Sequence, residues 1–256
     1  VRVYEDTDSK TSLPIRIMKI DASIMSNMFL DDHDLVSEGY RFFRFATFFN
    51  PEIKNALMLG GAGYSYPKDV RPNFPDSTID VVEIDPKVTS IAKKYFNLEE
   101  NRRLNIIHKD ARVFLNTSGN KYDAIYVNVF NPSGSLPFHL TTLEAMEKMY
   151  NLLSENGVIV VNIVSTIDGN QGKFVRAEYF TYRRVFPHVF LFVIPQQTDP
   201  TKIRHAMLVA AKSAPKGKLN EEYLLYLSYL YRGKITNDVA IITDDYSPVD
   251  QYMLGL

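Results

Sequence analysis

The feature that most constrains this sequence is an alternation of short aliphatic runs with helix-like segments, which begins near Pro51. We predict strands over 56–59, 79–83, 104–108, 122–129 and 157–164, and helices over 86–95 and 141–153. Sustained alternation of this kind is typical of a parallel sheet joined by crossover helices. The sequence therefore predicts an α/β, Rossmann-like fold for most of the chain.

The two ends of the chain have patterns of their own. Towards the C-terminus we predict a helix over 173–185, a closing pair of strands over 188–194 and 205–211, and a helix over 219–231. Near the N-terminus, the strand-like runs 15–20 and 25–30 are separated by the turn signal Asp21-Ala22-Ser23. We therefore divide the chain into a small N-terminal β-element, 1–44, and a Rossmann-like nucleoside-binding domain, 45–256.

The charge and residue content exclude several classes of protein. Lys and Arg number 29 against 30 Asp and Glu, so no net field attracts nucleic acid, and a small molecule is the expected partner. The chain has no cysteine, which excludes thiolate metal sites. Its five histidines are scattered through the sequence, so no metal is expected.

The apolar runs of the chain are short. The run 189–194 falls far below the roughly 20 residues that span a bilayer. We therefore expect a cytoplasmic location. Because the sequence begins at Val1 without Met, membrane attachment is expected only through a segment upstream of it.

A glycine-rich turn follows the first strand of the Rossmann-like domain. It contains Gly60, Gly61 and Gly63, and about twenty residues later the second strand ends with Glu83 and Asp85. Glycines allow a tight turn and close approach of a ligand, and a carboxylate at the second strand accepts hydrogen bonds from ribose hydroxyls. The combination predicts a nucleoside site, with an ordinary strand-to-helix turn as the alternative.

Two further positions refine this site. The third glycine of the dinucleotide fingerprint is replaced by Tyr66, whose ring would obstruct close helix packing, so a nicotinamide cofactor is disfavoured. After the third strand come Asp110 and Ala111. The Asp110 carboxylate could accept a hydrogen bond from an adenine amino group, or it could cap the following helix.

The order of these motifs resembles the spermidine synthase family, in particular its divergent bacterial branch fused to membrane segments. The resemblance is carried by Gly60-Gly61-Ala62-Gly63, Val82-Glu83-Ile84-Asp85-Pro86, Asp110-Ala111, Tyr122-Asp123-Ala124-Ile125 and Asn131-Pro132. It implies a class I methyltransferase-like sheet behind a small N-terminal β-domain. It also implies that Glu83 binds ribose, that Asp110 binds the adenine amino group, and that the donor is S-adenosylmethionine or its decarboxylated form. A homodimer is left open.

The chain departs from the family at three positions where an aspartate is usual. Gly63 stands where the glycine-rich loop carries an Asp that reads the donor's amine, and Asn128 and Asn131 stand where Asp residues follow the fourth strand. An amide orients a nucleophile by hydrogen bonding but is no general base near neutral pH. Ordinary transfer of an aminopropyl group to putrescine is therefore not expected.

The remaining catalytic candidates come from elsewhere in the sequence. Asn128 is the candidate for orienting a nucleophile, and His139, Asp123 and Asp245 are the candidates for a base. For His139 a surface or capping role is an alternative, and for Asp245 a turn. Tyr40 and its neighbourhood resemble the family's substrate-facing region in composition but not in order.

We predict from these motifs a spermidine synthase-like group transferase that acts on a small-molecule acceptor, with an amine as one candidate. Two alternatives stay open. One is a small-molecule methyltransferase that uses S-adenosylmethionine, and the other is a nucleoside-binding protein without catalysis.

Overall fold

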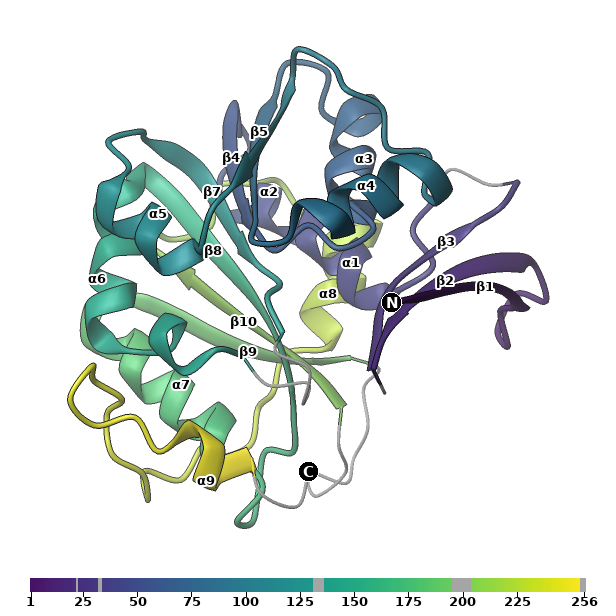
Figure 1. Ribbon diagram of the computed structural model, residues 1–256. Helices are drawn as coiled ribbons and strands as arrows, with labels where there is room; N and C mark the ends of the chain where they lie inside the picture. The colour runs from purple at the N-terminus through teal and green to yellow at the C-terminus, as the bar shows by residue number, and fades with distance from the viewer. Residues whose placement is uncertain (22, 32–33, 131–135, 195–203, 254–256) are drawn as a thin grey trace.

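A seven-stranded sheet forms the centre of the computed structural model, which describes residues 1–21, 23–31, 34–130, 136–194 and 204–253. The strand order is β6-β5-β4-β7-β8-β10-β9 (Figure 1). The strands are β4 (Asn55–Leu59), β5 (Thr78–Glu83), β6 (Leu104–His108), β7 (Tyr122–Val127), β8 (Leu153–Ser165), β9 (His188–Ile194) and β10 (Arg204–Ala211). This arrangement confirms the predicted Rossmann-like sheet.

The sheet combines a parallel part with an antiparallel edge. Strands β6, β5, β4, β7 and β8 pair in parallel, whereas β10 is antiparallel to both β8 and β9. The chain leaves β4 towards β5 on one side and returns to β7 on the other, so the order reverses between β4 and β7. Ligands of open α/β sheets bind outside the carboxyl ends of the strands at such a reversal.

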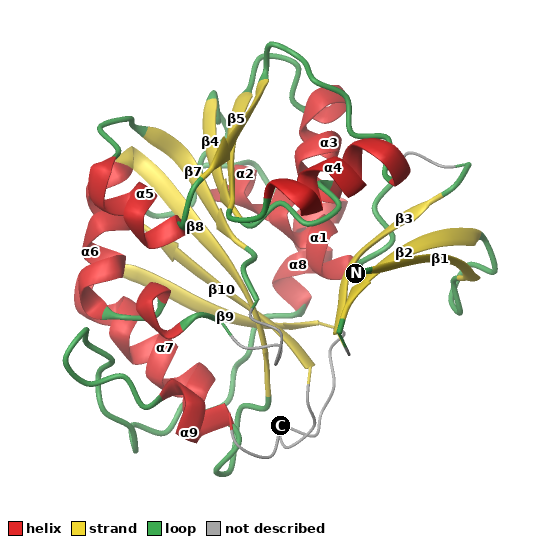
Figure 2. Cartoon of the chain, in the orientation of Figure 1, coloured by secondary structure: helices red, strands yellow, loops and turns green. Residues whose placement is uncertain are grey.

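Helices cover both faces of the sheet (Figure 2). One face packs on α5 (Ala111–Thr117), α6 (Leu143–Leu152), α7 (Lys173–Val185) and the short α9 (Val249–Met253). The other packs on α1 (Glu38–Phe42), η1 (Phe43–Phe45), α2 (Ala46–Phe49), α3 (Ser65–Asn73), α4 (Pro86–Tyr95) and α8 (Glu221–Ser228). Successive residues of β4 alternate between the two apolar cores, with Leu57 on the first face and Met58 on the second.

A separate three-stranded antiparallel sheet precedes these layers. It consists of β1 (Arg2–Thr7), β2 (Pro14–Ile20) and β3 (Ser23–Phe29). Met18 is fully buried in the core that contains α3 and α4, and the guanidinium of Arg16 donates a 2.7 Å hydrogen bond to the carbonyl of Tyr95 at the end of α4. The predicted N-terminal β-element is confirmed, while the division between residues 44 and 45 stays a prediction.

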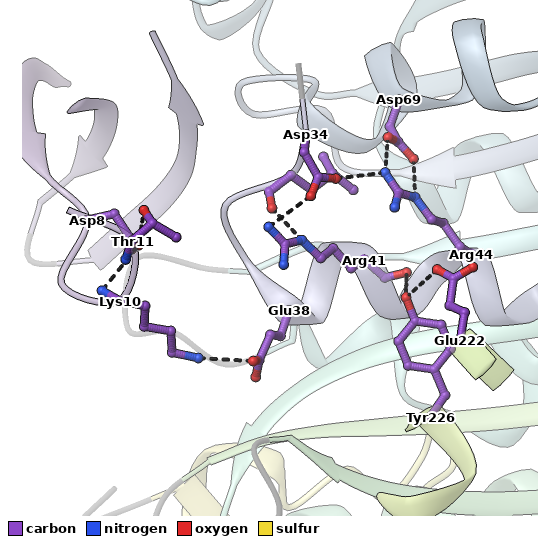
Figure 3. Close-up of polar contacts among 11 residues, drawn as sticks. Asp8, Lys10, Thr11, Asp34, Glu38, Arg41, Arg44, Asp69, Glu222 and Tyr226 are labelled. Atoms are coloured by element: carbon purple, nitrogen blue, oxygen red, sulfur yellow. Dashed lines mark hydrogen bonds and ion pairs between the residues drawn. The ribbon is translucent and has the colours of Figure 1, made fainter. Parts of the chain in front are cut away.

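Ion pairs fasten the segment between the two sheets (Figure 3). Arg44 donates to both carboxylate oxygens of Asp69 on α3, at 2.8 and 2.5 Å, and also pairs with Asp34 at 3.0 Å. Asp34 pairs in turn with Arg41, and Lys10 of the β1–β2 turn pairs with Glu38. Because the Asp69 side chain is only 1% exposed, its pairing with Arg44 is the buried member of this group.

Most predicted elements occur in the structure. Helices 86–95 and 173–185 and strand 104–108 have the predicted bounds, whereas the strand predicted over 122–129 ends at Val127. The prediction missed β1, which is largely exposed, and α3, whose residues include Pro67 and Pro72. Both lack the apolar periodicity on which sequence-based assignment depends. None of the helices in the described part of the chain is long and apolar enough to cross a membrane.

Candidate active site

A cavity of about 330 Å³ lies at the carboxyl ends of β4, β5, β6 and β7, where the strand order reverses. We refer to it as the carboxyl-edge cavity. Polar and loop residues in its lining include Gly60, Ala62, Glu83, Asp85, Asp110 and Asn128. Another cavity, of about 320 Å³, lies beside α7 and β9, and none of the residues predicted for the nucleoside site lines it.

The glycine-rich loop is shaped by contacts that leave no space for side chains. Gly60 has a φ of +90°, and a β-carbon there would lie 2.4 Å from the carbonyl oxygen of Asn128. At Gly63 a β-carbon would lie 2.5 Å from the hydroxyl of Ser26 and 3.0 Å from the ring of Phe96. An aspartate at this position would therefore require Ser26 and Phe96 to shift. Gly63 itself does not line the carboxyl-edge cavity.

Glu83 ties the loop to the second strand. Its Oε2 accepts hydrogen bonds from the backbone N–H groups of Gly61 and Ala62, at 3.0 and 3.1 Å, and its Oε1 accepts one from Asp85 at 3.0 Å. A carboxylate offers about four acceptor positions, so Glu83 retains capacity for a further donor. The residue is 8% exposed and lines the cavity, where that donor could be a ligand hydroxyl.

Asp85 and Asp110 each cap a helix at the cavity edge. Asp85 accepts a hydrogen bond from the backbone of Lys87, and Oδ1 of Asp110 accepts one of 2.9 Å from the backbone of Val113. The cap at Asp110 occupies Oδ1 only, and Oδ2 lies 3.6 Å from Nε2 of His139. The two roles considered for Asp110 are therefore compatible, since one oxygen caps α5 while the other lies near His139. The neighbouring Ala111 also lines the cavity.

Asn128 and His139 line the carboxyl-edge cavity, but the other two catalytic candidates do not. Asp123 stands at the amino end of β7, where it accepts hydrogen bonds from the backbone of Lys54 and Asn55 and from Ser154. Asn128 is five residue steps further along the extended chain, which corresponds to about 16 Å. Asp123 fastens the opposite edge of the sheet, and the structure does not bring it to the cavity.

Asp245 is exposed in a turn closed by hydrogen bonds between the backbones of Thr243 and Tyr246, and it does not line the cavity. The alternative role considered for it, a turn residue, agrees with this position. Its neighbour Asp244 pairs with Arg112 and accepts a hydrogen bond from Thr142.

Sequence reasoning missed the contribution of the N-terminal sheet. Ile20, at the end of β2, and Met25, near the start of β3, line the carboxyl-edge cavity. Both are ordinary apolar strand residues, so no sequence signal set them apart. Tyr66 lies outside the cavity and packs on Phe43 and Tyr126, with ring centroids 5.1 and 4.7 Å away. Within the described ranges, no cluster of three or more acidic or histidine side chains is arranged to hold a metal ion.

The strand order, together with an acidic cavity at the carboxyl edge, defines a Rossmann-like protein of the methyltransferase type. A family model described as "Spermine/spermidine synthase domain" matches residues 42–212, which is more than half of the chain. The chain belongs to the spermine/spermidine synthase family.

Individual relatives agree with this assignment. A polyamine aminopropyltransferase of Vibrio vulnificus is 37% identical over 153 residues, which cover 59% of this chain and 49% of that protein. The chain spans about half, or less, of the length of the curated relatives that it matches first.

Solved structures agree in fold. A probable spermidine synthase from Corynebacterium glutamicum superposes with a TM-score of 0.73 at 21% identity, over 91% of this chain and 85% of that one. Human methyltransferase-like protein 13, in complex with S-adenosylhomocysteine (SAH), superposes with a TM-score of 0.57 at 22% identity. The superposition covers 73% of this chain and 84% of that one.

Proposed function

We propose that this chain is a group transferase that binds S-adenosylmethionine or its decarboxylated form in the carboxyl-edge cavity. The observation that carries the proposal is the position of Glu83, held by three backbone N–H groups beside the glycine-rich loop with acceptor capacity left for a ligand. Ribose hydroxyls are donors of the kind this position accepts. Asp110, at the end of the next strand, is the proposed partner of the adenine amino group.

Either donor presents an electrophilic carbon on sulfonium sulfur to a nucleophile. The protein must align the two in line and keep the nucleophile unprotonated. Asn128 lies at the wall of the cavity where it can orient an acceptor by hydrogen bonding. Among the described residues that line the cavity, His139 carries an imidazole, the side chain most often used as a general base, and is our candidate for the proton acceptor.

The acceptor is a small molecule, and amines are the class that the polyamine aminopropyltransferase relative suggests. Standard transfer to putrescine is not part of the proposal. Asn128 supplies no negative charge for a cationic amine, and the loop has no room for a carboxylate at position 63.

A methyltransferase is the second candidate function. It is favoured by the fold likeness to the human methyltransferase-like protein that was solved with SAH. A protein that binds the nucleoside without turnover is a third.

Calorimetric titration with S-adenosylmethionine and with its decarboxylated form shows whether each donor binds. The two dissociation constants show which donor binds more tightly. Mass analysis of products from a polyamine panel then separates aminopropyl transfer, methyl transfer and binding alone. Failure of both donors and of methylthioadenosine to bind would overturn the proposal.

A further inference from the structure

Four polar side chains form one hydrogen-bonded chain from β10 to the N-terminal sheet, and we call this chain the amide relay. Nδ1 of His205 lies 3.0 Å from Oδ1 of Asn162, and Nδ2 of Asn162 donates a 3.0 Å hydrogen bond to Oδ1 of Asn128. Nδ2 of Asn128 donates a long hydrogen bond of 3.5 Å to the hydroxyl of Tyr40. That hydroxyl donates to the backbone carbonyl of Met25 at 3.0 Å.

The contact between Tyr40 and Met25 fixes which group donates and which accepts at each step of the amide relay. A backbone carbonyl only accepts, so the Tyr40 hydroxyl donates its proton to Met25 and must accept from Asn128. The Asn128 carbonyl is then left to accept from the amide of Asn162. By the same rule Oδ1 of Asn162 accepts from His205, whose Nδ1 must carry a hydrogen.

We infer that His205 is a positioning residue for Asn128, the polar side chain at the wall of the carboxyl-edge cavity. Neither His205 nor Asn162 lines that cavity. Asn162 is 5% exposed and Asn128 is 8% exposed, so the link between them has little access to water. A hydrogen on Nδ1 of His205 supports the orientation that Met25 and Tyr40 impose on the two carboxamides, whereas an acceptor in its place would oppose that orientation and turn the remaining N–H and lone pair of Asn128.

The amide relay also gives a physical reason for an amide at position 128. The residue there accepts from Asn162 and donates to Tyr40, and a carboxamide does both whereas a carboxylate only accepts. An aspartate would require Tyr40 to turn its proton away from Met25. Asn128 therefore fits the network built around it.

Two substitutions of His205 test the direction of the relay. The side-chain nitrogen of asparagine can occupy nearly the place of the histidine Nδ1, so His205→Asn keeps a donor towards Asn162. His205→Asp places only acceptors there, which obliges Asn162 and then Asn128 to rotate. His188→Asp is the matched control, because His188 pairs with Ala211 at the other end of the same β9–β10 hairpin, whereas His205 pairs with Ile194.

The first measurement is ¹⁵N NMR of the asparagine side-chain amides, with the Asn128 signal assigned by its loss in Asn128→Asp. We expect His205→Asn and His188→Asp to leave this signal in place and His205→Asp to displace it. Should His205→Asp fail to fold, His205→Leu removes the donor without adding charge and should displace the signal in the same way. An unmoved Asn128 signal in the folded donor-deficient variant, or equal displacement in His205→Asn, would overturn the inference.

The second measurement is calorimetric titration with methylthioadenosine, and only this part rests on the proposed function. We expect His205→Asn to bind within about twofold of the wild type, and His205→Asp to bind about fivefold more weakly, the effect of one misdirected neutral hydrogen bond. Equal affinities of the two variants would contradict a positioning role. If the wild type itself does not bind, the proposed function fails, while the NMR result still decides the relay.

Discussion

Nε2 of His139 lies 3.6 Å from Oδ2 of Asp110, so that a side chain from the η2 turn (Phe138–Leu140) meets the cap of α5 at the edge of the carboxyl-edge cavity. Both side chains are about one-third exposed, at 35% and 34%. A ligand that enters the cavity therefore meets the Asp110 carboxylate while one of its oxygens is held by the cap of α5. Substitutions that keep the cap but remove the charge can therefore separate an effect on binding from an effect on folding.

Asp110→Asn separates the two roles of this residue. Asparagine caps helices about as well as aspartate, so the free energy of unfolding should change by less than about 0.5 kcal/mol. Losing the charged acceptor next to the proposed adenine position should weaken methylthioadenosine binding by roughly tenfold. Calorimetry and chemical denaturation of the same preparation measure both quantities. Undiminished affinity would remove Asp110 from the proposed nucleoside site.

Glu83→Ala should weaken methylthioadenosine binding more strongly than Glu83→Gln. The alanine variant loses every acceptor for the loop and for the ligand, at a cost of about 1–3 kcal/mol, whereas glutamine retains one carbonyl oxygen. Because Glu83 also holds the backbone of Gly61 and Ala62, unfolding must be measured beside binding. Equal affinity of wild type and both variants would assign Glu83 to loop structure alone.

Wild-type protein should transfer little or no aminopropyl group to putrescine, and Asn128→Asp should bind putrescine about tenfold more tightly in the presence of methylthioadenosine. A charged hydrogen bond to an ammonium group contributes roughly 1.5–3 kcal/mol, against about 1 for a neutral one. Gly63→Asp is the contrasting variant. Its β-carbon would collide with Ser26, so it should lose stability without gaining affinity. Spermidine formation by the wild type at the rate of a known synthase would contradict this expectation.

The sequence could predict that Glu83 and Asp110 lie together, because each carboxylate follows a predicted strand. Glu83 and Asp110 lie at carboxyl ends of neighbouring parallel strands, and such ends meet at one edge of the sheet. Asp123 belongs to the same motif run, but it stands at the start of its strand and therefore on the far edge. Strand direction alone could have predicted that position.

The amide relay could not be predicted from the sequence. Asn162 interrupts the apolar run 158–164, and a polar residue in a buried strand signals a required partner. Its partners Asn128 and His205 lie 34 and 43 residues away in sequence. Pairing of β8 with β10 brings His205 next to Asn162, and only the register of those strands reveals it.

The ion pair between Arg44 and Asp69 should contribute more to folding than the pair between Arg44 and Asp34. The Asp69 side chain is 1% exposed and that of Asp34 is 40% exposed, although both accept from the same guanidinium. Removing one partner of a buried pair costs about 3–5 kcal/mol, whereas an exposed pair contributes about 0–1 kcal/mol. Chemical denaturation of Asp69→Asn and Asp34→Asn tests this, and equal losses would contradict it.

Glu178 should make the protein less stable as the pH rises. This residue of α7 is fully buried, and neither carboxyl oxygen has a hydrogen-bond partner among the described residues. Burial raises the pKa of Glu178 well above its ordinary value. The carboxyl group is therefore protonated in the folded state at pH values where the unfolded chain, with a pKa of about 4.3, releases the proton.

Proton binding determines whether the free energy of unfolding rises or falls with pH. Between the unfolded and folded pKa values the folded state holds more protons, so the free energy of unfolding falls as the pH rises, by about 1.4 kcal/mol per pH unit. The stabilising effect is fully present below about pH 4.3 and is lost as the pH rises through the folded pKa. Glu178→Gln cannot ionise, so its stability relative to the wild type should increase from pH 5 to pH 8. Exposed Glu147→Gln on α6 is the matched control and should run parallel to the wild type. Denaturation curves from pH 5 to pH 8 measure the free energy of unfolding of each variant. A constant difference in that free energy between Glu178→Gln and wild type would show that Glu178 is ionised in the folded protein.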